Sequence, residues 1–179
     1  MTTWTMRIGC ALLALGAVAN ADVTKKTDAT KTKKEATTHK HEMNKPDTVF
    51  INASDIKFGA APPDLPKGGE LAVLFGDPMK PGQFTVRFKM PDGYKIPPHW
   101  HTQDENLTIL SGTLLLYMGD TMTGEPHSLN VGGYHFLPGK AHHAAQAKGE
   151  VIVQIHGPGP FDIHYLNPAD NPNPKTARR

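Results

Sequence analysis

Short apolar stretches, separated by turn residues, follow one another through the middle of the chain. Gly, Pro and Asp gather in clusters typical of chain reversals, for example at 91–93, 111–112, 132–133 and 157–160. The stretches between the clusters are too short for usual helices, and several are rich in Val, Ile, Phe, Tyr and Thr. They are 71–75, 84–89, 105–110, 113–118, 134–137, 151–156 and 161–166. The pattern predicts an all-β fold of antiparallel strands, a sandwich or a barrel, with residues 47–60 as a further edge strand.

Residues 1–21 have the pattern of a secretory signal peptide. A single Arg at position 7 precedes an apolar run over 8–19, and the small-x-small sequence at 19–21 follows. A run of 12 residues is shorter than the roughly 20 that cross a bilayer, which disfavours the alternative of a membrane anchor. We therefore expect a protein exported to the periplasm or the extracellular space, with no stable membrane span after signal cleavage.

The rest of the chain divides into a linker, one domain and a tail. Residues 22–46 are rich in Lys and Thr with hardly an apolar side chain, and predict a flexible, disordered N-terminal tether. Residues 47–168 are long enough for a single domain with its own core. Residues 169–179 are mostly polar, contain two Pro residues and show no apolar periodicity, so they are expected to form a C-terminal tail. Because the only cysteine is Cys10, inside the predicted signal, disulfides and thiolate metal ligands are excluded from the mature protein.

The charge of the predicted domain argues against nucleic acid. The whole chain has a formal charge of +2, but residues 47–170 hold eight Lys and Arg against thirteen Asp and Glu. A nucleic-acid-binding face is normally basic. We therefore expect a small-molecule ligand or substrate rather than a nucleic acid as partner.

The segment 93–112 carries the candidate chemistry. His99 and His101 are two residues apart, so on an extended strand both imidazoles leave the same face. Glu105 returns to that face if the chain stays extended past a short bend. Two imidazoles and a carboxylate on one side form a facial ligand set that suits iron(II) and similar ions while leaving other coordination positions open. The alternative is a polar pair of histidines on an exposed strand.

At this segment the sequence resembles the cupin superfamily. The first cupin motif, G-x5-H-x-H-x3-E-x6-G, is matched at every position, by Gly93, His99, His101, Glu105 and Gly112. The second motif, G-x5-P-x-G-x2-H-x3-N, is matched only in part. Its matching residues are Gly132, Pro138 and His143, whereas Lys140 and Ala147 replace its Gly and Asn.

The resemblance implies the fold and the metal site. The fold would be a single-domain cupin, a double-stranded β-helix or jelly-roll barrel. One divalent transition-metal ion would be bound by His99, His101, Glu105 and His143, and Fe, Mn, Ni and Zn are not distinguished. Because neighbouring side chains on a strand point to opposite faces, only one of His142 and His143 can face the ion, and the motif spacing selects His143.

Three further polar side chains are candidates for orienting a ligand or a substrate. They are His135, Gln154 and His156, each on a predicted strand. The alternative for each is a buried residue whose hydrogen bonds go to the backbone. Pairing of two barrels into a homodimer is also implied by the resemblance.

Two functions follow from these expectations. The first is a metal-dependent enzyme acting on a small organic molecule, with dioxygenase-type oxidation ahead of isomerase or lyase chemistry by analogy with the fold. The second is a non-catalytic cupin that binds a metal or a small ligand. Turnover of a substrate that stops in the His101→Ala variant would indicate the enzyme. Retention of a ligand without turnover would indicate the non-catalytic cupin.

Overall fold

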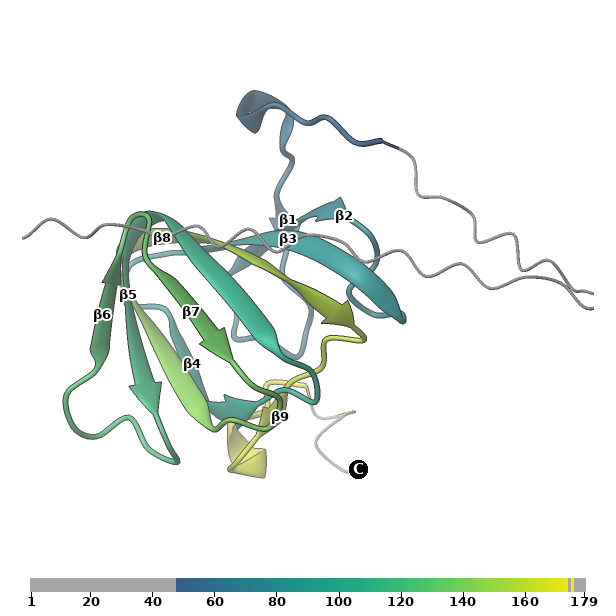
Figure 1. Ribbon diagram of the computed structural model, residues 1–179. Coiled ribbons are helices and arrows are strands. Elements are labelled where there is room, and N and C mark those ends of the chain that lie inside the picture. Colours follow the sequence, from purple (N-terminus) through teal and green to yellow (C-terminus); the bar gives the residue numbers. More distant parts are fainter. Residues whose placement is uncertain (1–47, 174, 176–179) are drawn as a thin grey trace, which may run out of the picture. The chain divides into compact units, whose positions relative to one another are not determined.

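The structure is a computed structural model that describes residues 48–173 and 175, and its regular structure is β apart from two short 3-10 turns (Figure 1). The turns are Ala53–Asp55 and Pro168–Asp170. The strands are β1 (Gly59–Ala60), β2 (Glu70–Phe75), β3 (Gly82–Met90), β4 (Lys95–Trp100), β5 (Glu105–Met118), β6 (His127–Asn130), β7 (Tyr134–Leu137), β8 (His143–Gly159) and β9 (His164–Tyr165). Within the described part of the chain, no helix is both long and apolar enough to cross a membrane.

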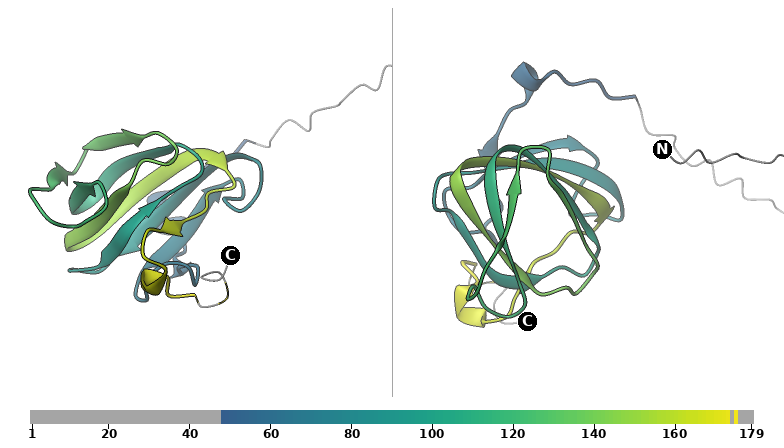
Figure 2. Two further views of the ribbon diagram at one scale, coloured as in Figure 1. Left: turned by 90° about the horizontal axis from the view of Figure 1, so that it is seen from below. Right: turned by 60° about the vertical axis from the view of Figure 1, so that its left-hand side comes forward.

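Two long strands, β5 and β8, organise the sheet. The strand order is β1-β2-β3-β8-β4-β9, and β5 adds pairings to β6, β7 and β8, all antiparallel. β8 pairs with β3 through residues 151–159, with β4 through 143–146, and with β5 in both halves. A strand that changes partner along its length curls the sheet on itself, and the view at the right of Figure 2 looks into the resulting ring of strands. The predicted all-β barrel is confirmed.

Alternation along the strands places the core inside this ring. On β3 every second residue from Phe84 to Met90 is buried, and on β8 the residues at 151, 153 and 155 are buried while their neighbours are more exposed. Side chains on a strand alternate between its two faces, so each strand contributes one apolar row to the interior. Leu107, Ile109 and Leu114 of β5 complete the core.

The predicted turn at 111–112 is wrong, because this dipeptide lies inside β5. The pairing of β5 with β8 shifts register on both sides of Ser111, which is a β-bulge. Gly112 has a φ of +74°, and a Cβ there would lie 2.3 Å from the carbonyl oxygen of Glu150. Glycine is favoured in turns and in bulges for the same reason, its freedom at positive φ, which explains why a turn was predicted here. The two predicted stretches 105–110 and 113–118 are one strand.

The other differences from the predicted pattern concern edge strands, prolines and the predicted turn 157–160, of which residues 157–159 belong to β8. The predicted edge strand 47–60 is reduced to β1, and the stretch 161–166 to β9. β4 and β6 were not predicted. β4 contains Pro97 and Pro98, which carry no N–H for a sheet, and its pairing with β8 is interrupted between Ile96 and His99. The predicted signal peptide and the tether up to residue 46 lie outside the described residues.

Candidate metal centre

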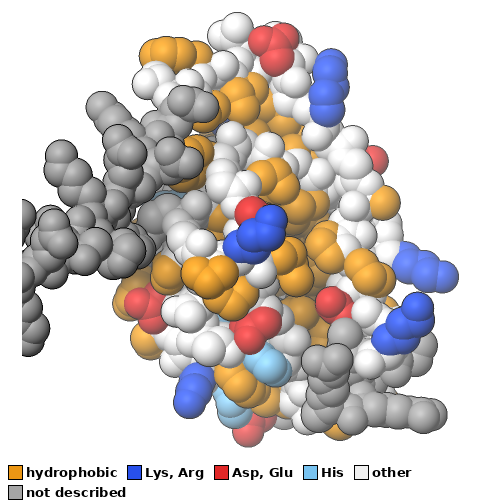
Figure 3. Space-filling model, turned by 90° about the vertical axis from the view of Figure 1, so that its right-hand side faces the viewer, with side chains coloured by type: hydrophobic (Ala, Val, Ile, Leu, Met, Phe, Trp, Pro, Cys, Tyr) orange, Lys and Arg blue, Asp and Glu red, His pale blue; other side chains and the backbone are white. Residues whose placement is uncertain are grey.

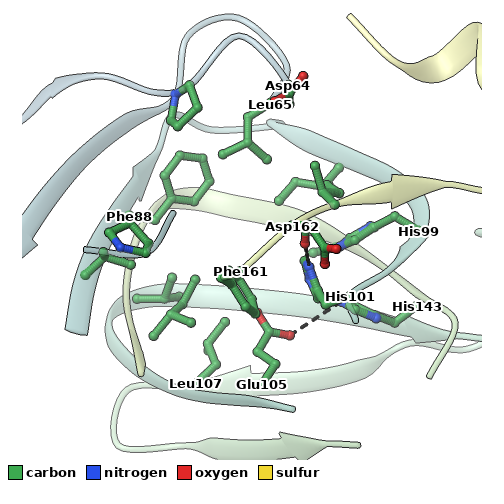
Figure 4. A pocket seen from close by; sticks show the side chains of 18 of the residues that line it. Asp64, Leu65, Phe88, His99, His101, Glu105, Leu107, His143, Phe161 and Asp162 are labelled. Carbon is green, nitrogen blue, oxygen red and sulfur yellow. Dashed lines mark hydrogen bonds and ion pairs between the residues drawn. The ribbon is translucent and has the colours of Figure 1, made fainter. Parts of the chain in front are cut away.

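Three buried histidines from two strands converge at one end of the barrel interior (Figure 4). His99 lies near the end of β4, and His143 begins β8 directly opposite it in the antiparallel register. His101 follows β4 by one residue. Their exposed fractions are 2%, 3% and 7% for His99, His143 and His101. One ligand atom from each lies within 4.8 Å of the other two, a spacing suited to a single metal ion.

Each imidazole is oriented through its Nδ1 atom by a backbone carbonyl. A carbonyl oxygen only accepts, so each Nδ1 donates, and the neutral ring then carries its lone pair on Nε2. Orientation of this kind is typical of metal-ligating histidines. The pairs are His99 with Pro97 at 2.7 Å, His101 with Asp162 at 2.5 Å, and His143 with Ala141 at 3.0 Å. The donor set therefore fits a divalent metal ion.

Glu105 lies beside this group at the start of β5. It is buried, and its Oε2 lies 3.4 Å from Nε2 of His143 and 3.2 Å from Nε2 of His135. Burial opposes ionisation, but the hydrogen bonds to His135 and His143 and the nearby His101 hold the pKa of the Glu105 carboxyl well below its usual range. The carboxylate is thus ionised, which is the form that binds metals.

The three imidazoles differ in their electrostatics. Burial, together with the neighbouring His143 and His101, holds the pKa of His99 well below its usual value. Burial also lowers the pKa of His101, against the opposing effect of Glu105. For His143 the effect of burial is outweighed by the hydrogen bond to Glu105, and its pKa is raised. His99 and His101 are neutral rings, the form that binds a metal ion, whereas His143 is paired with the Glu105 carboxylate.

The remaining histidine and glutamine candidates are placed differently. His135 of β7 is buried and contacts Glu105, as described above. Gln154 and His156 lie on the outward row of β8, where Gln154 accepts a hydrogen bond from Arg87 and His156 is exposed. The structure therefore does not bring these two to the centre. His142 also points away from it, with Nδ1 2.6 Å from Asp120.

The segment 161–164 completes the surroundings of His101 and was not anticipated from the sequence. Phe161 stacks on the imidazole with ring centroids 4.2 Å apart. The Asp162 carboxylate accepts hydrogen bonds from Thr102, at N (2.8 Å) and Oγ1 (2.6 Å), and from Nε2 of His164 at 2.8 Å. These bonds hold the Asp162 carbonyl against His101. Because about sixty residues separate the partners, no local motif signals the contact.

The comparisons with known proteins agree with this fold. The polyketide cyclase RemF from Streptomyces resistomycificus matches with a TM-score of 0.60 and 17% identity over 70% of this chain and 90% of its own. A protein named as a candidate acetylacetone dioxygenase from Methylibium petroleiphilum has a TM-score of 0.56 and 15% identity over 72% and 88%. An RmlC-like cupin from Ralstonia eutropha has a TM-score of 0.54 and 18% identity over 70% of this chain and 76% of its own.

At such identities these structures show the fold alone. No curated protein matches the chain. The family model of the ChrR cupin-like domain matches residues 46–161, most of the described part of the chain, and this range contains all four residues of the cupin motifs that face the centre. With the barrel, the motifs and this match in agreement, the chain belongs to the ChrR cupin-like family of the cupin superfamily.

Proposed function

We propose that this protein is an exported, metal-dependent enzyme that acts on a small organic molecule. His99, His101, His143 and Glu105 would hold one divalent transition-metal ion. The observation that carries the proposal is the group of three buried imidazoles, each with Nδ1 committed to a carbonyl, which makes Nε2 the atom that would bind a metal ion; Nε2 of His143 lies 3.4 Å from Glu105, the fourth proposed ligand. Export is supported by the signal-like residues 1–21.

Residues around the proposed metal ligands would orient them and exclude water from the site. A bound ion of this type can polarise a substrate oxygen as a Lewis acid or activate dioxygen. His135 donates to Glu105 and holds the carboxylate in place. Phe161 covers one face of His101 and keeps water from it. Four protein ligands leave open positions on an ion of about six-fold coordination, which is where a substrate would bind.

The reaction class is proposed by analogy with the family. Dioxygenase-type oxidation comes first and isomerase or lyase chemistry second, because the cupin fold hosts all of them. A non-catalytic cupin that retains a metal or a small ligand is the second candidate. It is favoured because the further carboxylate and imidazole beside the centre, Asp162 and His164, are hydrogen-bonded to each other, and the carboxylate also accepts from Thr102.

Metal content in single variants tests the proposal. The protein purified without an affinity tag should contain one ion per chain, and His99→Ala, His101→Ala and His143→Ala should each reduce this to a small fraction. His142→Ala is the matched control, because its side chain is outward and paired with Asp120. Full metal content in the three inward variants would refute the site. Substrate-panel assays with the loaded protein, aerobic and anaerobic, then separate oxidation from isomerisation and from binding without turnover.

A further inference from the structure

A cavity of about 520 Å³ in the barrel interior reaches the three histidines. Its volume lies in the range of small-molecule sites. Figure 4 shows His99, His101 and His143 at one side of this space and Leu65 and Phe88 across from them, with Leu107 next to Glu105 and Asp64 next to Leu65. Away from the histidines the wall is mostly apolar, with Asp64 as a further acidic residue. A ligand that fills the cavity must therefore present a largely apolar body to the wall away from the histidines.

The wall offers little else to a polar ligand. Most of the lining is apolar, including Met90, Leu114 and Ile155. The other polar residues of the wall are Asp64, Asp162, His164, Tyr165 and Asn171. The Tyr165 hydroxyl donates to the carbonyl of Asp64, the Asp64 carboxylate accepts from Asn173, and the Asp162 carboxylate accepts from Thr102 and His164. A negatively charged group on the far end of a ligand would therefore lose its water next to the Asp64 carboxylate without gaining a cation.

The charges of the wall limit the charge of the ligand. Among the described residues, no Lys or Arg lines the cavity. On the face shown in Figure 3, hydrophobic side chains gather over the middle, and most Lys and Arg lie toward the margin. A divalent ion bound by the Glu105 carboxylate and three neutral imidazoles would have one net positive charge, which favours an anionic head group at the ion. The wall also holds the carboxylates of Asp64 and Asp162, so a second negative charge on the ligand would be buried without a cation.

We infer that the site takes an amphiphilic monoanion, with a two-oxygen head such as a carboxylate on the metal side and an apolar body along the wall at Leu107, Leu114 and Ile155. Medium-chain monocarboxylates are the simplest members of this class. The inference rests on the proposed metal site and adds the class of molecule that the site accepts.

Binding of a matched set of compounds to the cobalt(II)-loaded protein tests the inference. Calorimetry gives affinity, and the visible absorption of the cobalt reports whether the head reaches the ion. Affinity should rise from butanoate through hexanoate to octanoate by about fourfold per methylene. Suberate, which has the length of octanoate and a second carboxylate at the far end, should bind at least about tenfold more weakly. 1-Octanol should leave the cobalt spectrum unchanged.

A pair of variants tests whether the wall tolerates a further negative charge. Ile163 lines the cavity and is partly exposed, so Ile163→Glu adds a negative charge to the wall at small cost to folding. It should weaken octanoate severalfold while the cobalt content stays at one ion per chain. Val131→Glu, on a surface position 65% exposed and outside the cavity, is the control and should bind octanoate normally.

The outcomes separate this inference from the proposed function. A protein that takes up no cobalt overturns the metal site and the inference with it. A loaded protein that binds butanoate or suberate as tightly as octanoate overturns the inference and leaves the metal site standing. Equal octanoate affinity in Ile163→Glu and Val131→Glu also overturns it, because a further negative charge on the cavity wall would then not affect the ligand.

Discussion

His135 is the residue on which the position of Glu105 depends. A carboxylate only accepts hydrogen bonds, so the 3.2 Å contact has Nε2 of His135 as donor. Its Nδ1 atom is the only buried side-chain nitrogen or oxygen without a hydrogen-bond partner among the described residues. An unpartnered buried nitrogen is destabilising. The fold tolerates it at the one position where the other ring nitrogen holds a candidate ligand, which indicates a role in the site.

The His135→Phe substitution separates that role from packing. The phenyl ring keeps the side chain apolar and of similar size, but removes the donor to Glu105. We expect metal affinity to fall by about 10- to 100-fold in competition with a chelator. The free energy of unfolding of the metal-free protein should change little, because removal of the unpartnered nitrogen offsets the loss of the hydrogen bond to Glu105. His156→Phe, on the exposed outer row of β8, is the control. Unchanged affinity in both variants would contradict the positioning role.

At the scale of elements, the bulge at Gly112 lets β5 follow β8 around the barrel. β5 carries Glu105 at its first residue and pairs with β7, which carries His135. The register shift at Ser111 separates the half of β5 that faces residues 152–156 from the half that faces 143–148. His143 is paired with Met118, so Glu105 and His143 lie at opposite ends of the β5–β8 pairing; their side chains meet across the interior because the paired strands curl, and a bulge increases such bending.

Two glycine variants test the bulge. Gly112 and Gly149 have nearly equal φ angles, +74° and +75°, but a Cβ meets the Glu150 backbone at Gly112 and open space at Gly149. Gly149→Ala should lower the free energy of unfolding by about 1 kcal/mol, from backbone strain alone. Gly112→Ala should lower it by about 3 kcal/mol or more, because strain and clash combine. Urea denaturation measures both. Equal losses would show that the strand relaxes around the added methyl group.

At the scale of the whole described domain, two tyrosines close the barrel end at the 61–69 segment. The Tyr94 hydroxyl donates to the carbonyl of Pro66 at 2.5 Å, and that of Tyr165 to the carbonyl of Asp64 at 2.8 Å. Tyr94 also packs edge-on against Phe88. Tyr165 and Asp64, 101 positions apart in the chain, are thereby joined beside the cavity, which both residues line.

These tyrosines predict a loss of stability in alkali. Burial raises the pKa of Tyr94 to about 12, and it raises the pKa of Tyr165 as well. In the unfolded chain both phenols ionise near pH 10. The contribution to stability is therefore complete below about pH 10 and is lost as pH rises toward 12. Urea denaturation from pH 9 to 11 should show this fall, and Tyr94→Phe should flatten it. Tyr134→Phe, an exposed residue of β7, should leave it unchanged; the same slope in all three proteins would contradict the prediction.

The local pattern of the sequence determined the class of fold and the positions from which ligands come. Alternation and turn residues depend only on neighbours in the chain, so the all-β barrel and most of its strands could be predicted, as could the shared face of His99 and His101. The cupin motifs extended this to Glu105 and His143. β4 could not be predicted, because prolines disfavour a strand. Gly112 predicted a turn where the structure has a bulge, because glycine is favoured in both.

Only the tertiary structure decided what surrounds those residues. Which of the two rows of side chains on β8 faces the interior depends on which side of the strand packs against the core. In the structure, His143 lies on the inner row and Gln154 and His156 on the outer row. The Asp162 carbonyl on His101, the His135 donor to Glu105 and the apolar cavity all join residues that are distant in the chain. Such contacts come from strand pairing and closure of the barrel, which no short stretch of sequence encodes by itself.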